Sequence, residues 1–402
     1  MRETILASLL ALTVCFPQAE SQDGRSRHPQ AGDSSGSAEA GPSGPNGFAG
    51  DLACRDCHAD KYDSYLRTPH HLSSQTADRT SISGSFTPGK NVMATFNPQL
   101  SFVMKASNQN FYEIARTYRN GQTMDHAERI DLVIGSAAKG QTYLYWKGDA
   151  LFELPVSFWT SLNRWVNSPG YVDGSADFDR PVTPRCLECH ATYFQPLSQS
   201  ATENRYSRSN FVLGISCERC HGSAQQHIRD QQAARGGRAA VNRMPPVGLA
   251  RERQIDVCAQ CHAGVGRSLA PAFSFRAGDK LSDFIVPPQP ALQDKVDVHG
   301  NQVALLQKSR CFQASPDLSC STCHDVHAPA KAAASYSDRC LACHRGEQCS
   351  EVRRLGTKAA SDCIDCHMPV QASTQLTVDT EETRLPAKVR NHWIRVYDRN
   401  RP

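Results

Sequence analysis

Cysteine and histidine recur in this chain in one arrangement, Cys-x-x-Cys-His, which occurs seven times and uses fourteen of the 17 cysteines. Residues at positions i, i+3 and i+4 share one face of a helical turn, so each repeat gathers two thiols and one imidazole. Two such thiols can bond the vinyl groups of a porphyrin while the imidazole ligates its iron. The cysteines are Cys54, Cys57, Cys186, Cys189, Cys217, Cys220, Cys258, Cys261, Cys320, Cys323, Cys340, Cys343, Cys363 and Cys366. The motif histidines are His58, His190, His221, His262, His324, His344 and His367.

Other uses of paired cysteines fit these repeats less well. A zinc ribbon needs its Cys-x-x-Cys pairs two by two, and seven pairs leave one without a partner. Iron-sulfur clusters favour tighter runs of cysteine and have no use for a histidine after every pair. A plain disulfide scaffold would not repeat one spacing seven times. The repeats therefore predict seven covalently attached haem c groups, with the motif histidines as proximal iron ligands.

Eight histidines lie outside the motifs, and they bear on what the haems do. An iron with two strong axial ligands transfers electrons, whereas an iron with an open side can bind a small substrate. His28 lies in a low-complexity segment, which leaves seven candidate distal ligands for seven irons. His71 is the weakest of them, because neighbouring residues in an extended chain point in opposite directions. The other candidates are His70, His126, His227, His299, His327 and His392.

Two of these candidates follow a motif histidine closely. His227 comes six residues after His221, so on a continuing helix it points away from the haem of its own motif. His327 comes three residues after His324, where the porphyrin plane blocks it from the far side of that haem. Both are therefore expected to reach a different haem. An equal number of distal candidates and irons favours bis-histidine ligation, and one histidine that does not bind would open an iron.

Two further cysteines, Cys311 and Cys349, belong to no motif. In an oxidising compartment an even remainder suggests one disulfide, which here would link the loop before the fifth motif to the loop after the sixth. The third extra cysteine, Cys15, stands in the N-terminal apolar segment.

The N-terminal residues have the outline of an export signal. Arg2 precedes an apolar run at residues 5–16, and small residues follow, so residues 1–21 are predicted to be a signal peptide. A lipoprotein anchor at Cys15 is a weaker alternative, because Val14 is bulky for the position before such a cysteine. Residues 22–50 are rich in Gly, Ser, Pro, Ala and Gln and are predicted to be a flexible tether. These features indicate a periplasmic or otherwise extracytoplasmic protein.

The chain has too few apolar side chains to form a conventional hydrophobic core by themselves. Only 39% of the residues are hydrophobic and 7% are aromatic. The formal charge of +4 comes from scattered basic residues, which makes nucleic-acid binding a weak interpretation. Each haem would add two propionates, so the holoprotein is expected to be acidic. Arginines close to the motifs are natural partners for those propionates. They are Arg55, Arg185, Arg219 and Arg345.

The elements that must position these residues divide unevenly along the chain. Residues 51–80 form the first-haem segment, and residues 181–402 hold the other six motifs. At that density the porphyrins must supply the buried apolar surface, with short helices and irregular loops around them. Residues 81–180 are predicted to form a small β-rich insert. Strands are expected at 100–105, 110–118, 130–134, 141–147 and 150–156, with a two-residue hairpin turn at Gly148-Asp149.

Several stretches resemble the multihaem c-type cytochromes, in the class related to the tetrahaem electron carriers of nitrification. Residues 54–73, with a tyrosine pair and Thr68-Pro69-His70, are similar to the first-haem segment of that class. Residues 130–136, 141–144 and 165–171 are similar to the insert that precedes the second haem. The resemblance implies secreted electron-transfer proteins with closely packed haems, and distal ligands after long loops at His299 and His392. No Cys-x-x-Cys-Lys occurs, so the lysine-ligated catalytic haem of the nitrite reductases is absent.

The sequence therefore predicts an exported heptahaem cytochrome c that moves electrons along a packed haem chain between redox protein partners. Bis-histidine ligation would give its haems low reduction potentials. The alternative is a multihaem oxidoreductase in which one five-coordinate haem acts on a small nitrogen or sulfur compound. A small-molecule substrate is expected only in that alternative, and membrane association only through the N-terminus.

Overall fold

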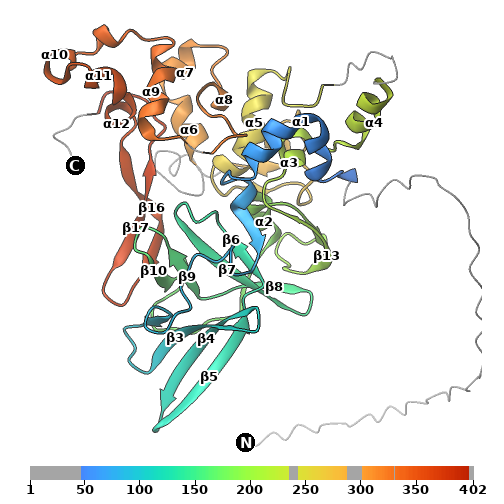
Figure 1. The fold of residues 1–402 in the computed structure, drawn as a ribbon, viewed down its shortest axis with the longest axis vertical. Coiled ribbons are helices and arrows are strands. Elements are labelled where there is room, and N and C mark those ends of the chain that lie inside the picture. The colour runs from blue at the N-terminus through green and yellow to red at the C-terminus, as the bar shows by residue number, and fades with distance from the viewer. Residues whose placement is uncertain (1–46, 235–242, 288–300, 330, 398–402) are drawn as a thin grey trace, which may run out of the picture. The chain divides into compact units, whose positions relative to one another are not determined.

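The computed structural model describes residues 47–234, 243–287, 301–329 and 331–397. The predicted signal peptide, most of the predicted tether, His28 and His299 lie outside these residues. The chain from Ser43 onward forms one compact unit. Figure 1 labels its helices and strands.

Strands occupy most of residues 74–181 and form two antiparallel sheets (Figure 1). The first is a four-stranded meander of β2 (Val92–Ala94), β3 (Leu100–Ser107), β4 (Asn110–Arg119) and β5 (Gln122–Arg129). The second runs in the order β1 (Ser74–Thr76), β6 (Leu132–Ile134), β7 (Gly140–Lys147), β8 (Ala150–Glu153) and β11 (Arg180–Pro181). Its branch adds β9 (Val156–Trp159), which pairs with β7, and β10 (Arg164–Asn167), which pairs with β9.

The turns of these sheets follow the local sequence. The hairpin predicted at Gly148-Asp149 joins β7 to β8, with Lys147 opposite Ala150 and a positive φ at Gly148. The single strand predicted at residues 150–156 is two strands, β8 and β9, with Leu154 and Pro155 between them. Proline cannot donate to a ladder, so the chain changes partners there. Strand β5 was not predicted, because it is polar on both faces and almost wholly exposed.

A side-chain core fills the β-rich part. Phe102, Met104, Tyr143, Leu154 and Val156 have no exposed surface. They belong to one cluster with other buried apolar side chains from β3, β4, β7, β9 and β10. Alternate residues of β3 are buried, which is the pattern of a strand with one face on a core.

Helices, most of them short, recur through the rest of the described chain. The helices that contain or adjoin motif residues are α1 (Leu52–Tyr65), α2 (Pro184–His190), α3 (Cys217–His221), α5 (Arg251–His262), α8 (Cys320–Cys323), α9 (Ser337–Leu341) and α12 (Cys363–His367). The others are α4 (Gln225–Ala234), α6 (Gln302–Gln307), α7 (Arg310–Ala314), α10 (Val352–Leu355) and α11 (Lys358–Ser361). Most have fewer than eight residues, too few to be stable as isolated helices in water.

Three two-stranded sheets interrupt the helices, where the sequence had predicted helices and irregular loops. They pair β12 (Ala191–Pro196) with β13 (Tyr206–Leu213), β14 (Arg267–Ser268) with β15 (Ile285–Val286), and β16 (Val370–Asp379) with β17 (Arg384–Arg390). The last hairpin packs Val378 and Ala387 against Trp159 and Val166 of the β-rich part. A small apolar cluster also packs on α5 through Ile255 and Ala259.

Within the described part of the chain, no helix combines the length and the apolar character that crossing a bilayer requires.

Candidate haem-binding sites

Most motif histidines stand at or near the C-terminal end of a helix, directly after the second cysteine of the motif. Four of them, His190, His221, His262 and His367, are the last residues of their helices. His324 directly follows α8, with extended backbone. His58 lies at a kink inside α1, where its φ of −126° and ψ of 41° leave the helical range. The i, i+3, i+4 spacing thus places each imidazole beside its own cysteine pair.

Four of the motif histidines face a second imidazole from elsewhere in the chain. An iron that binds two imidazoles at about 2 Å each holds their ring centres roughly 6 Å apart. The centroid distances in the four pairs match this requirement. They are 6.5 Å for His58 and His227, 5.9 Å for His221 and His327, 6.3 Å for His262 and His70, and 6.2 Å for His324 and His392.

The pairs join separate motifs into a network. His327 follows His324 by three residues, yet its ring stacks with His221 of the third motif. His227 follows His221, yet it stacks with His58 of the first motif. Each second imidazole therefore comes from outside the motif that it faces. The described part of the chain contains no cluster of three or more His, Cys, Asp or Glu side chains that could hold a metal ion. Residues that meet in axial pairs suit a macrocycle that supplies the other ligands of its iron.

Backbone carbonyls hold several of these imidazoles through Nδ1. His221 Nδ1 lies 2.5 Å from the Pro245 oxygen, His367 Nδ1 2.9 Å from the Arg395 oxygen, and His392 Nδ1 3.2 Å from the Arg390 oxygen. Nδ1 must donate to a carbonyl, which leaves the lone pair of Nε2 for a metal. Burial also lowers the pKa of His262 and His392 to about 4, which keeps both rings neutral.

The remaining candidate histidines have other surroundings. His71 packs its ring edge-on against Tyr65, with 5.1 Å between centroids. His126 lies on β5 with 59% of its side chain exposed, 3.3 Å from Glu128. The carbonyl of motif histidine His190 accepts hydrogen bonds from the hydroxyls of Ser73 and Ser74.

Cysteines of different motifs meet side by side. Thiols of the first and third motifs, the second and fourth, the fourth and fifth, and the sixth and seventh lie close enough to influence each other's pKa. The pairs are Cys54 with Cys217, Cys189 with Cys261, Cys258 with Cys320, and Cys340 with Cys363. Each motif with such a contact presents its cysteine edge to a neighbour, so the groups attached there would be closely packed.

The disulfide expected between Cys311 and Cys349 is not present, since both residues are free thiols. Helix α7 instead brings Cys311 near Cys323 and Cys340. Burial first, and then the neighbouring Cys311 thiol, raises the pKa of Cys323. Cys349 lies elsewhere, at the end of the 3-10 turn Gly346–Gln348.

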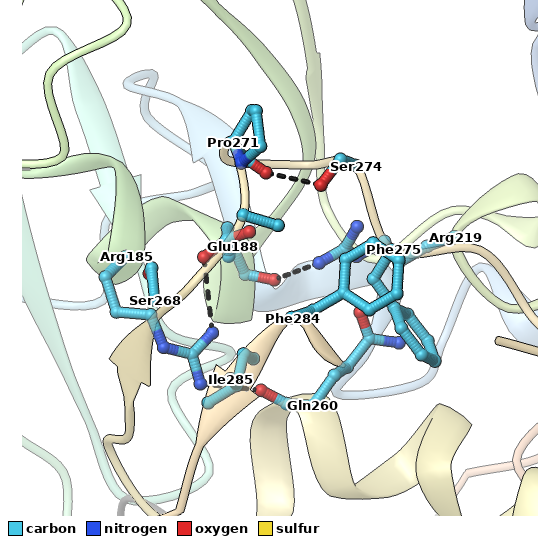
Figure 2. Close-up of a pocket in the computed structure, with 11 residues that line it drawn as sticks. Arg185, Glu188, Arg219, Gln260, Ser268, Pro271, Ser274, Phe275, Phe284 and Ile285 are labelled. Carbon is cyan, nitrogen blue, oxygen red and sulfur yellow. Dashed lines mark hydrogen bonds and ion pairs between the residues drawn. The ribbon is translucent and has the colours of Figure 1, made fainter. Parts of the chain in front are cut away.

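A buried polar cluster between three motifs was not predicted as a unit (Figure 2). We call it the arginine node, and it consists of Arg185, Glu188, Arg219 and Gln260. Arg185 donates to the Gln260 carbonyl at 2.8 Å, and Arg219 donates to the Glu188 carbonyl at 2.9 Å. The sequence predicted both arginines as partners of haem propionates, and the structure shows that each guanidinium group also donates to a backbone carbonyl of a neighbouring motif. The sequence feature that could have revealed this cluster is that Arg219 lies inside a Cys-x-x-Cys-His motif and Arg185 directly precedes one.

Comparisons with known proteins agree with this geometry. The sequence model of the family described as cytochrome c554 and c-prime matches residues 163–222, which include the second and third motifs. A 102-residue stretch is 31% identical to the C-type polyheme cytochrome OmcC of Geobacter sulfurreducens. That stretch is 25% of this chain and spans only 12% of the length of OmcC.

A solved structure extends the likeness to most of the fold. The crystal structure of the outer cell wall cytochrome OcwA aligns with a TM-score of 0.55 and 16% identity, over 86% of this chain and 79% of that one. At this identity the likeness concerns the fold alone. The fold therefore resembles that of the cytochrome OcwA. The matched parts of the sequence resemble c-type cytochromes, a class whose cofactor is covalently bound haem c with iron.

Proposed function

We propose that this protein is an exported electron-transfer cytochrome with seven covalently attached haem c groups, one at each motif. The observation that carries the proposal is the set of four imidazole pairs at 5.9 to 6.5 Å, each containing a motif histidine. Imidazole on both sides of an iron fills its axial positions, which suits electron transfer and opposes substrate binding. When bound, haem supplies one-electron chemistry, as its iron alternates between the ferric and ferrous states.

The order of motif contacts supports a path for the electrons. Thiols that influence each other's pKa pair the first motif with the third, the fourth with both the second and the fifth, and the sixth with the seventh. Cys220 has a smaller influence on the pKa of Cys258, and Cys343 on that of Cys323, which places these thiols near one another as well. We assign the path to motifs one, three, four, five, six and seven in turn, with the second motif attached at the fourth.

Seven irons need seven distal ligands for complete bis-histidine ligation. Four of the proposed distal ligands are His70, His227, His327 and His392, which form the imidazole pairs. His71 and His299 remain for two of the other irons. His126 is assigned to the surface, because its ring is mostly exposed on β5 and lies beside Glu128.

The position of His126 favours a second candidate function. Without it, six histidines remain as distal ligands for seven irons. One five-coordinate iron would then be open to a small nitrogen or sulfur compound, and the protein would act as a multihaem oxidoreductase.

Two measurements on the purified protein test the proposal. The mass of the denatured chain should exceed that of the processed polypeptide by seven haems, and fewer would overturn the haem count. The electron paramagnetic resonance spectrum of the oxidised protein should be dominated by low-spin signals from the six irons to which a distal histidine is assigned. A high-spin fraction that responds to nitrite or hydroxylamine would instead favour the oxidoreductase.

Export and partners belong to the same proposal. The protein would be exported through the predicted signal peptide and would exchange electrons with other redox proteins. N-terminal sequencing of the protein from the extracytoplasmic fraction tests this directly. A mature chain that begins after residue 21 supports cleavage by a signal peptidase, and one that begins at Cys15 indicates a lipoprotein instead.

A further inference from the structure

The arginine node lies where three motifs meet. Arg185 directly precedes the first cysteine of the second motif, and Glu188 stands between its two cysteines. Arg219 and Gln260 hold the corresponding inner positions of the third and fourth motifs. The four side chains therefore come from α2, α3 and α5, and each is close in sequence to a haem-anchoring cysteine.

Hydrogen bonds hold the two guanidinium groups in place. Arg185 of the second motif binds the carbonyl of Gln260 in the fourth, and Arg219 of the third binds the carbonyl of Glu188 in the second. The thiol of Cys189 lies 3.8 Å from the Gln260 carbonyl, and that of Cys261 lies 3.7 Å from the Glu188 carbonyl. The arginines thus converge on the point where the second and fourth motifs touch.

The node carries more positive than negative charge. Figure 2 shows Glu188 between the two arginines, and among the described residues that line the adjacent cavity it is the one acidic side chain. Its carboxylate is 3.4 Å from Arg185, and it also accepts the Phe273 amide at 2.8 Å. Two guanidinium groups against one carboxylate leave one net positive charge.

Water and ions have little room to screen that charge. The side chains of Arg185 and Glu188 are only 12% and 10% exposed. The cavity that the node lines has a volume of about 10 Å³, roughly enough for one water. The Nε atoms of Arg185 and Arg219 and the Oε1 of Gln260 are buried without a hydrogen-bond partner among the described residues. A charge in such surroundings acts over a longer range than one in solvent.

We propose that Arg185 and Arg219 raise the reduction potentials of the haems held by the second and fourth motifs above those of the other haems. The inference rests on the proposed electron-transfer function and deepens it. A fixed positive charge stabilises the ferrous state, because reduction adds an electron to the site nearby. Electrons entering the chain would therefore collect at these two haems, of which the fourth lies on the proposed path and the second branches from it.

Neutralising one arginine tests the proposal. In Arg219→Gln and Arg185→Gln, a potentiometric titration followed by optical and paramagnetic resonance spectra should show two haems that are harder to reduce. We expect their ferrous-to-ferric ratio at a given potential to fall about tenfold, which corresponds to about 59 mV for a one-electron couple. The cysteines and histidines remain, so every haem can still attach.

Arg55 provides a matched control within the same chain. It also stands between the two cysteines of a motif, but its side chain is 55% exposed and pairs with Asp63 at 3.3 Å. Solvent screens it, so Arg55→Gln should leave all midpoint potentials unchanged. Equal shifts in Arg55→Gln and Arg219→Gln, or no shift in either node variant, would overturn the proposal. The second result is also expected if haem propionates neutralise the node.

A charge-conserving variant separates electrostatics from packing. Arg219→Lys keeps the positive charge while losing the planar hydrogen-bonding group, and it should retain most of the wild-type potential. A Lys variant as strongly shifted as Gln would assign the effect to structure and contradict the proposal. The haem count and spin state of each variant are measured first. A deficit there in the wild-type protein would refute the proposed function rather than this inference.

Discussion

The β-rich part and the motif-bearing part of this chain differ in what forms their interiors. Between residues 74 and 181, long strands bury large side chains such as Phe102 and Tyr143 completely. In the motif-bearing part, several helices have only four or five residues, and most motif cysteines retain partial exposure. Side chains fill the first interior, whereas the second would depend on the haems proposed to attach to its cysteines and histidines.

The two parts therefore owe their stability to different interactions. A strand in a sheet gains ladder hydrogen bonds and an apolar face together. A helix of one turn gains too few backbone hydrogen bonds to repay the entropy of ordering it. Covalent bonds to a large apolar macrocycle and an axial bond to its iron would supply what such helices lack. Four experiments test whether the two parts are stabilised in these different ways.

Preventing haem attachment should have the largest effect. In protein made without the haem-attachment machinery, α3, α8 and α12 are expected to lose their structure, because each has only four or five residues. The strands β3, β4 and β7 should remain folded on their own core. Hydrogen exchange measured by mass spectrometry checks both statements in one sample. Slow exchange in α3 and α12 of the apoprotein would show that the two parts do not differ in this way.

Removing a core side chain should damage the β-rich part selectively. Phe102→Ala is expected to lower its stability by about 3–5 kcal/mol, the usual cost of truncating a buried phenylalanine. The haem spectrum should stay unchanged, because this cluster contains no motif residue. Chemical denaturation followed by hydrogen exchange of β3 and β7 gives the size of the loss. Phe96→Ala is the control, since that ring is 67% exposed and should cost little.

Removing a proposed axial ligand should change one haem of the seven. His392→Ala deletes the imidazole that faces His324 at 6.2 Å, so one low-spin signal should become high-spin. Added imidazole should restore the low-spin signal by binding the iron in place of the deleted His392 side chain. His126→Ala is the control in the β-rich part and should leave the spectrum intact. A high-spin signal in His126→Ala would reverse its assignment to the surface.

Glu113 should give the β-rich part a pH dependence of its own. Burial raises the pKa of this carboxyl well above its usual 4.5, and one of its oxygens accepts the Val156 amide at 2.9 Å. The folded state therefore retains a proton that the unfolded chain loses above about pH 4.5. Stability should fall as pH rises from there, by up to about 1.4 kcal/mol per unit.

Glu113→Gln should remove this slope, because an amide does not titrate. Unfolding of the β-rich part at several pH values between 4.5 and 8 would measure it. Glu128→Gln is the matched control, since Glu128 lies opposite Glu113 in the ladder and is more exposed. If Glu113→Gln keeps the wild-type slope, the carboxyl is not responsible for it.

The sequence predicted the β-rich part where patterning was clear. Strands β3, β4 and β7 alternate or cluster apolar residues, and the turn at Gly148-Asp149 has a local signature. Strand β5 escaped prediction, because an exposed edge strand has no apolar face to reveal it. The hairpin of β16 and β17 escaped for a different reason, since it is held partly by distant residues such as Trp159.

The candidate sites divide in the same way. The cysteines and the histidine of each motif could be recognised in the sequence, because they lie within five consecutive residues. Which second imidazole faces which motif was not predictable, since His70 and His262 are far apart in sequence. The Nδ1 acceptors were invisible for a simpler reason. Every residue has a backbone carbonyl, so nothing in the sequence marks Pro245 or Arg395.

By itself, the sequence predicts the chemistry of this protein: the number of groups that it would hold, the atoms that would anchor them, and a second axial imidazole for many of the irons. These properties depend on residue type and on spacing within one helical turn. Tertiary structure alone decided how the imidazoles pair, which motifs touch, and that Arg185 and Arg219 lie partly buried beside each other while Arg55 is exposed. Contacts between distant segments set these outcomes, because burial and local dielectric arise only when the chain has folded.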